Sequence, residues 1–546
     1  MAAEPANKLE SLPTITSASG PPLTIPEITT GLGTRFYESL EKYKDQIHCV
    51  DSSTGATETK NSVKMRAIKV AKELIKNGVG QNDVVIVASK VHMDLIVCVL
   101  GCLFVGAIVA PVHSDHPHEE LKQLVIILQP KFAFCGSRCS RLLMPILKEE
   151  RINCPIYTFE SDSRDFISFD KCLENPDDPS FKAATILNPK STVAFISYTQ
   201  GTESDQKMVA ISHYAIAMRY MSMLDWAFKK SEKVVSTFPM NNITMILVMC
   251  ICFDSPAKHV ILGSITERAI LKVLHDLRVE VLYIDSDLAI RICKNTAVGD
   301  FDLSNLKMIF LTNAILTKNY VRVVRSFRTL TVAIDYGTVE SGMVAYATQQ
   351  TYLQHHDKLN SIGQLMPGVS VKILPPQNGV APPGWGELHV RSPCLMLSYY
   401  NNHVPTKPIS KGYFITGDLA KIDSDGFLYI RGRCSDEIIR EDNVFSTAEV
   451  DNAILIHPDI EEVAAFENED GDLIACVVRK EGRDVSQASI LKVVAEILPK
   501  YKIPTKIIFK TGLPKTLLGT IKKYKLKESM VELIREESFY HADVDD

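Results

Sequence analysis

Short runs rich in valine and isoleucine alternate with helical patterns along most of the chain, and this alternation most constrains the fold. The strand-like runs cover residues 83–89, 106–112, 131–136, 192–198, 258–263, 279–285, 306–312 and 330–337. Helical stretches lie between several of them, for example at residues 265–278. Such alternation predicts βαβ units, so we expect an α/β protein with largely parallel sheets and helices on their faces.

The pattern changes in the last third of the chain. From about residue 361, short strands and closely spaced turns predict a small β-rich subdomain. After residue 433, helical and strand-like runs predict an α+β domain of about 110 residues, which is within the usual size range of domains. We therefore expect a loose tail at residues 1–25, a large domain at 26–432, and a small mobile domain at 433–546 whose hinge lies near residues 433–435.

Composition excludes few classes of function. A chain of 546 residues, 46% hydrophobic, exceeds a single core. The net charge of −5 gives no sign of a nucleic-acid partner. The 13 cysteines contain no CxxC pair, which favours free thiols in a reducing compartment. No signal peptide, transit peptide or C-terminal S-K-L is present, so we expect a cytoplasmic protein.

One apolar stretch raises the question of a membrane. Residues 95–112 carry no charge over eighteen positions, the lower edge of what a membrane-spanning helix needs. Gly106 and Pro111 interrupt the stretch, and no basic flank accompanies it. We expect a buried helix that leads into a buried parallel strand, and no stable membrane span.

A polar loop at residues 197–213, "SYTQGTESDQKMVAISH", follows a predicted strand. Phosphate-binding loops use glycine so that backbone N–H groups can close on an anion. This loop keeps a single glycine, Gly201, and one lysine, Lys207. It is consistent either with a degenerate phosphate loop or with a polar surface turn.

Motifs in the same order along the whole chain resemble those of one family. The two most specific are "YFITGDLAKIDSDGFLYIRGR" and "LPKYKIPTKIIFKTGLPKTLLGTIKKYKL", and "DYGTVESG", "GQLMPGVSVKIL" and "GELHVRSP" also match. They resemble the adenylate-forming acyl- and aryl-CoA synthetases, which include 4-coumarate–CoA ligase-like enzymes and luciferases. The resemblance implies a carboxylic acid substrate, ATP or AMP, Mg²⁺ and CoA. It also implies a C-terminal domain that swivels between the two half-reactions.

The resemblance assigns three residues to the nucleoside. Asp418 in "TGD" and Arg433 in "GR" match the residues that bind the ribose hydroxyls. Tyr336 matches the tyrosine that stacks on adenine.

Phosphate and metal contacts follow by the same resemblance. Glu340 matches the glutamate that helps to hold Mg²⁺, and Thr202 and Lys207 are what remains of the phosphate loop. Two carboxylates, Glu203 and Asp205, now lie in that loop. A like charge within about 4 Å costs on the order of 1–4 kcal/mol at surface-like dielectric unless Mg²⁺ intervenes.

The most serious departure is at the C-terminus. The family's catalytic lysine, which contacts the developing charge on the α-phosphate, is replaced by Thr520. Loss of one such donor typically lowers the rate by roughly 10²–10³. Lys522 follows two residues later, displaced by about 7 Å along a strand. Val339 also replaces a threonine on the metal side, and Asn242 lies where the family has a histidine.

Two hypotheses follow. The first is an acid–CoA ligase whose catalysis is weakened or lost. The alternative is a pseudoenzyme of the same fold that binds AMP, an acyl group or CoA, or that acts through a protein partner.

Overall fold

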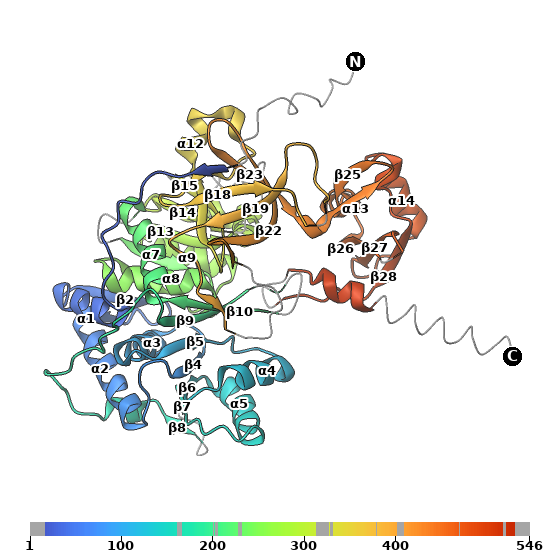
Figure 1. Ribbon diagram of the computed structural model, residues 1–546. Coiled ribbons are helices and arrows are strands. Elements are labelled where there is room, and N and C mark those ends of the chain that lie inside the picture. The colour runs from blue at the N-terminus through green and yellow to red at the C-terminus, as the bar shows by residue number, and fades with distance from the viewer. Residues whose placement is uncertain are drawn as a thin grey trace.

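The computed structural model describes residues 17–160, 166–199, 201, 206–227, 232–312, 327, 331–377, 379–400, 409–468, 470–516 and 520–529. Two large sheets and their helices form the body, and the C-terminal elements lie to one side of it (Figure 1). The predicted fold class is confirmed. Each of the eight predicted strand-like runs contains a strand.

The first sheet has eight strands in the order β20-β10-β9-β5-β4-β6-β7-β8. Its strands are β4 (Val84–Ala88), β5 (Ile108–Pro111), β6 (Phe132–Cys135), β7 (Ile156–Thr158), β8 (Ile167–Ser168), β9 (Val193–Tyr198), β10 (Met208–Ser212) and β20 (Ser398–Tyr399). The neighbours from β9 through β8 pair in parallel, whereas β10 pairs antiparallel with both β9 and β20. The helices along this part of the chain are α3 (Met93–Val105), α4 (His118–Leu128), α5 (Ser137–Glu149) and α6 (Asp170–Leu173).

The second sheet has fifteen strands. The part that runs from β2 to β15 is parallel. That part contains β2 (Ile47–Asp51), β12 (Lys258–Ile261), β11 (Lys233–Ser236), β13 (Val281–Asp285), β14 (Met308–Thr312) and β15 (Thr331–Thr338). β3 (Thr57–Thr59) pairs antiparallel at the β2 edge. The helices are α1 (Leu32–Lys42), α2 (Lys60–Lys76), α7 (His213–Ala227), α8 (Ile243–Asp254), α9 (Glu267–Asp276), α10 (Ser286–Lys294) and the 3-10 turn η1 (Thr296–Asp300).

The β-rich subdomain continues the same sheet. From β15 the order runs β16 (Gly342–Thr348), β17 (Gly363–Leu365), β23 (Phe427–Arg433), β22 (Tyr413–Ile422), β19 (Gly386–Arg391), β18 (Ser370–Leu374) and β1 (Ser17–Ser19), and β21 (Ile409–Ser410) pairs with β22. All of these pairs are antiparallel. Helix α12 (Gln349–Gln354) and the 3-10 turn η2 (His356–Lys358) connect β16 to β17. The sequence predicted these short strands but not that they would extend the parallel sheet.

The apolar stretch at residues 95–112 is the buried helix and strand that the sequence predicts. Every residue of α3 from Leu95 to Val105 is buried, and β5 lies inside the first sheet. Gly106 caps α3 in the left-handed conformation, with φ of 74°, and so turns the chain into β5. Among the described residues, no helix is both long enough and apolar enough to cross a membrane.

The C-terminal elements form a separate apolar core. They are η3 (Cys434–Asp436), β24 (Glu437–Arg440), β25 (Asn443–Ser446), α13 (Thr447–Ile454), β26 (Ile460–Glu467), β27 (Leu473–Arg479), α14 (Gln487–Ala495), η4 (Lys500–Lys502) and β28 (Lys506–Lys510). β26, β27 and β28 form a three-stranded sheet, against which buried residues of both helices pack. This is the predicted α+β arrangement. The exact boundary at residue 433 stays a prediction.

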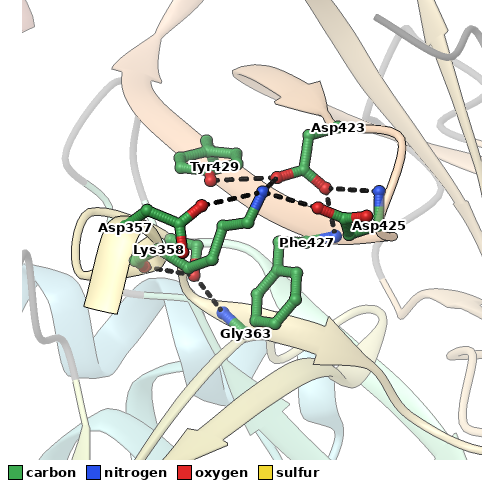
Figure 2. A network of polar contacts seen from close by, with 8 residues as sticks. Asp357, Lys358, Gly363, Asp423, Asp425, Phe427 and Tyr429 are labelled. Atoms are coloured by element: carbon green, nitrogen blue, oxygen red, sulfur yellow. Dashed lines mark hydrogen bonds and ion pairs between the residues drawn. The ribbon is translucent and has the colours of Figure 1, made fainter. Parts of the chain in front are cut away.

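A buried lysine anchors the turn between β22 and β23. Lys358 is 4% exposed, and its ammonium lies 2.8 Å from a carboxylate oxygen of Asp423 and 2.8 Å from one of Asp425 (Figure 2). Tyr429 donates a further hydrogen bond to Asp423 at 3.0 Å. Hydrogen bonds to Asp423 and Asp425 raise the pKa of Lys358 against the lowering effect of burial. The network ties η2 to the hairpin of β22 and β23, the two strands that end the large body of the protein.

We predict that Lys358→Met lowers stability strongly. The substitution leaves Asp423 buried without its cation, and breaking a buried pair typically costs about 3–5 kcal/mol. The thermal midpoint should fall by several degrees, and adding Asp423→Asn should restore part of the loss. Lys272→Met removes an exposed ion pair with Asp276 on α9 and is the matched control. An equal midpoint for Lys358→Met and this control would contradict the role of the network.

Two buried histidines predict a loss of stability in acid. Burial lowers the pKa of His213 and of His259 to about 4, whereas the pKa of an unfolded histidine is about 6.5. The unfolded chain therefore binds more protons between these values. Each histidine contributes roughly 3 kcal/mol of stability above pH 6.5, and this is lost as the pH falls towards 4.

The measurement is the thermal midpoint at pH 7.5 and at pH 5. His259→Leu should lose less stability on acidification than the wild-type protein, because one proton-binding difference is removed. His118→Leu, on the exposed start of α4, is the control for loss of a surface imidazole. If His259→Leu and the wild-type protein lose stability equally on acidification, the prediction is wrong.

Candidate active site

The segment that the sequence predicts as a phosphate loop follows β9 and precedes β10, and these two strands pair antiparallel. Next to the two strands, the Thr199 N–H donates to the Lys207 carbonyl at 3.0 Å, and the Lys207 N–H donates to Thr199 Oγ1 at 3.0 Å. Gly201 has φ of 68°, a left-handed conformation that glycine adopts without strain. Thr202, Glu203 and Asp205 lie outside the described residues.

Lys207 and Glu340 are brought together by a third residue, Tyr399. The Lys207 ammonium lies over the Tyr399 ring, 5.2 Å from its centroid. The Tyr399 hydroxyl donates a 3.0 Å hydrogen bond to Glu340 Oε1. Burial and the Glu340 carboxylate raise the pKa of Tyr399, and the charge of Arg433 opposes that shift. A lysine, a glutamate and a tyrosine from three distant segments thus form one polar group.

Sequence reasoning missed Tyr399. The residue lies in β20, a two-residue strand that pairs with β10, and Met396, three residues earlier, is hydrogen-bonded to the Glu340 carbonyl. No spacing or periodicity in the sequence indicates that contact.

The turn that carries Glu340 is closed by its own side chains. The Thr338 N–H donates to Ser341 Oγ at 3.1 Å, and the Ser341 N–H donates to Thr338 Oγ1 at 3.0 Å. Thr338 is thereby used within the turn, and Val339 packs against the large apolar core. Glu340 is 8% exposed. Its own carbonyl accepts a hydrogen bond from the Met396 N–H at 2.7 Å.

Tyr336, Asp418 and Arg433 form a second group, as their assignment to one nucleoside would require. The Tyr336 hydroxyl donates to Asp418 Oδ2 at 2.5 Å. Arg433 Nη1 donates to Asp418 Oδ1 at 3.0 Å and to the Thr416 carbonyl at 2.9 Å. β22 and β23 place Asp418 directly opposite Arg433 in register, while Tyr336 comes from β15.

A glycine allows the arginine to cross the strand. Gly417 has φ of 74°, and a Cβ at this position would lie 2.9 Å from Arg433 Nη2. Burial, followed by the charge of Asp418, raises the pKa of Tyr336 well above its usual value. The tyrosine therefore stays a neutral hydrogen-bond donor near neutral pH.

Thr520 and Lys522 lie in a C-terminal hairpin. The Thr520 backbone exchanges hydrogen bonds with Thr516, through its N–H to Thr516 Oγ1 at 3.2 Å and through its carbonyl from the Thr516 N–H at 2.8 Å. Thr520 is exposed. Lys522 is largely buried, and its ammonium lies 3.5 Å from Glu120 on α4. The structure joins this hairpin to the large domain through Lys522, not through the residue at the catalytic-lysine position.

Two other departures from the family's sequence pattern have local structural explanations. Asn242 caps α8, where its Oδ1 accepts a hydrogen bond from the Thr244 N–H at 2.8 Å. Asp442, which by the same resemblance replaces a glycine, adopts φ of 62° in the tight turn between β24 and β25. Aspartate is one of the few residues that enter this left-handed region at modest cost.

The residues present fit a nucleotide and a single magnesium ion. Asp418 is a buried carboxylate beside an aromatic ring and a guanidinium, and a carboxylate is the kind of acceptor that ribose hydroxyls would need. Among the described residues, no three His, Cys, Asp or Glu side chains gather as a metal site. Mg²⁺ that is bound through one carboxylate and substrate phosphates needs no such cluster, and Glu340 fits that role.

Comparisons with known proteins identify the family. The AMP-binding enzyme family matches residues 36–400, and its C-terminal domain matches residues 449–520. The chain is 25% identical to 4-coumarate–CoA ligase-like 9 of Arabidopsis thaliana over 500 residues, 89% of this chain and 87% of that protein. It is 25% identical to luciferin 4-monooxygenase of Photuris pensylvanica over 447 residues, 78% of this chain and 81% of that one.

A solved structure has the same fold. ATP-bound MatB from Rhodopseudomonas palustris superimposes with a TM-score of 0.77 at 22% identity, covering 91% of this chain and 98% of that one. The match to the family covers well over half of the chain and agrees with the motifs. The chain therefore belongs to the AMP-binding enzyme family of adenylate-forming, acyl-CoA synthetase-like proteins.

Proposed function

We propose that this protein binds an adenine nucleotide and a carboxylic acid, and that its acid–CoA ligase activity is weak. The observation that carries the proposal is the contact of Tyr336, Asp418 and Arg433. These three residues come from different strands and meet around one buried carboxylate. A nucleoside offers a flat base and two hydroxyl donors, which match an aromatic ring and a carboxylate.

The ligase reaction would use these residues in two steps. In the first, a carboxylate oxygen of the acid attacks the α-phosphorus of ATP, and the bond to pyrophosphate breaks. In the second, a thiol, which we propose is that of CoA, attacks the acyl carbon, and AMP leaves. In-line attack at phosphorus depends on positive groups aimed at the phosphoryl oxygens. Lys207 and Glu340, through a bound Mg²⁺, are the described residues suited to that demand.

The proposed weakness lies in the first step. Thr520 has no charge and is too short to act in place of a lysine. Lys522 is held at Glu120, a carboxylate of the large domain. Attraction to Glu120 opposes any movement of Lys522 towards the phosphate site.

A second candidate function is favoured by the pairing of Lys522 with Glu120. If Lys522 stays at Glu120, the protein would bind nucleotide or acyl ligand without turnover, as a pseudoenzyme. Its effect would then pass through a protein partner.

In both cases we place the protein in the cytoplasm and the hinge of the small domain near residues 433–435.

We predict that AMP stabilises the protein and that Asp418→Ala reduces the effect. The variant removes the acceptor for the ribose hydroxyls, and loss of charged hydrogen bonds of this kind weakens binding by about tenfold or more. The measurement is the shift of the thermal midpoint with AMP, and with ATP and Mg²⁺. Asp276→Ala, which removes an exposed carboxylate of α9, is the control. A wild-type protein that responds to neither nucleotide would overturn the proposal.

We predict that Thr520→Lys increases pyrophosphate–ATP exchange. A restored donor to the phosphoryl oxygens should raise the rate by about 10²–10³. The assay uses a panel of carboxylic acids of different length and aromaticity, with Lys523→Thr as a control that removes a nearby lysine.

The outcomes of this assay separate the two candidate functions. Exchange by the wild-type protein with any acid would exclude the pseudoenzyme. No gain with Thr520→Lys would contradict the assignment of the weakness to residue 520.

A further inference from the structure

Arg219 is a buried cation that the proposed reaction has not used. It lies on α7 and is 4% exposed. Burial lowers its pKa to about 10, so the guanidinium remains charged at neutral pH. The carboxylate that influences this pKa is Glu340, which acts through charge attraction and not through a hydrogen bond. Burying a charged group costs free energy unless hydrogen bonds or an opposite charge compensate for the lost hydration.

Two of its three nitrogens hold main-chain carbonyls. Arg219 Nη2 donates to the Val339 carbonyl at 2.8 Å and to the Cys394 carbonyl at 2.7 Å. Arg219 Nε donates to the same Cys394 carbonyl at 3.1 Å. One planar group therefore ties together two segments that are more than fifty residues apart.

Both segments are connected to Glu340. Val339 is its immediate neighbour in the turn. Cys394 precedes Met396, whose N–H donates to the Glu340 carbonyl at 2.7 Å, and Tyr399, whose hydroxyl donates to the Glu340 carboxylate at 3.0 Å. The guanidinium is thus bonded to the residue before Glu340 and to the start of the segment that carries Met396 and Tyr399.

The packing around the guanidinium is tight. A Cβ at Gly342 would lie 2.6 Å from the Cys394 Cβ and 3.2 Å from Arg219 Nε. Gly342, two residues after Glu340, has φ of 69°, which a side chain would strain. The turn can therefore shift little while Arg219 is in place.

We propose that Arg219 is a positioning residue that fixes the Glu340 carboxylate for Mg²⁺ coordination. The inference rests on the proposed function, in which Glu340 helps to hold the magnesium of ATP. It goes further by naming what orients that carboxylate. An arginine suits the task because its rigid fork reaches two acceptors at once, whereas a lysine offers one flexible point charge.

A third nitrogen distinguishes this arginine from a simple structural clamp. Arg219 Nη1 is buried and has no hydrogen-bond partner among the described residues. The charge next to Glu340 is therefore not neutralised by a direct ion pair, and the carboxylate remains available for a metal ion.

The test compares Arg219→Met and Arg219→Lys with the wild-type protein by calorimetric titration with AMP and with ATP and Mg²⁺. AMP reports on Tyr336, Asp418 and Arg433, while the magnesium complex also needs Glu340. We expect Arg219→Met to weaken binding of the magnesium complex by about tenfold, the effect of losing a charged hydrogen bond, and to leave AMP binding within about twofold. Arg219→Lys should recover only part of the loss.

The matched control is Arg479→Met in β27. Arg479 also uses Nε and Nη2 to hold a main-chain carbonyl, that of Val485, but in the C-terminal domain. This variant should keep the wild-type ratio of the two affinities. The positioning role would be overturned if Arg219→Met weakened the binding of AMP and of the magnesium complex equally. It would also be overturned if Arg219→Lys restored the full affinity for the magnesium complex.

Hydrogen exchange separates this inference from the proposed function. If the wild-type protein binds neither ligand, the proposed function fails, and the positioning role is then judged by the amide of Met396. Its exchange should be faster in Arg219→Lys than in wild type, because the Glu340 turn loses one of its anchors. Unchanged exchange would overturn the inference, and this readout also serves if Arg219→Met does not fold.

Discussion

The segment at residues 392–400 joins the two large sheets, and the candidate site depends on it. Leu397 N–H donates to the Ala210 carbonyl at 2.9 Å, and Tyr400 N–H donates to the Met208 carbonyl at 2.8 Å, so this segment is bonded to β10. Met396, in the same segment, is bonded to Glu340 in the turn between β15 and β16 of the other sheet. Lys207 and Glu340 therefore both contact Tyr399 because one stretch of backbone is hydrogen-bonded to β10 and to the turn between β15 and β16. Backbone hydrogen bonds in such a buried place are costly to leave unmade, which fixes the geometry.

Charge is the basis on which we propose weak ligase activity. Tyr336 and Arg433 each donate a hydrogen bond to the Asp418 carboxylate. Lys207 lies over the Tyr399 ring, and Lys522 pairs with Glu120. Arg219 is charged but bonds to main-chain carbonyls. We therefore propose binding that is retained and phosphoryl chemistry that is weakened, a distinction that nucleotide titration and pyrophosphate exchange address separately.

Sequence reasoning predicted the elements better than their contacts. The eight strand-like runs formed strands because apolar β-formers bounded by turn residues leave few alternatives. The buried helix and strand at residues 95–112 followed from the glycine and proline that interrupt the stretch. Tyr399 and Arg219 were not predicted, because their importance comes from contacts between distant parts of the chain. Tyr399 contacts Glu340 across a separation of 59 positions, and Arg219 contacts Val339 across a separation of 120 positions. The antiparallel extension of the parallel sheet was missed for the same reason, since strand order is a long-range property.

The sequence by itself determined the α/β class, the separate α+β region at the C-terminus, the family resemblance and the residue types available for nucleotide binding. These follow from local patterns of apolar, turn-forming and motif residues, which are encoded within short windows of the chain. Only the tertiary structure decided that Lys522 pairs with Glu120, that Tyr399 links Lys207 to Glu340, and that Arg219 holds the turn before Glu340. Each of these is a contact between distant segments, and it is set by which strands pair and which side chains can be buried together.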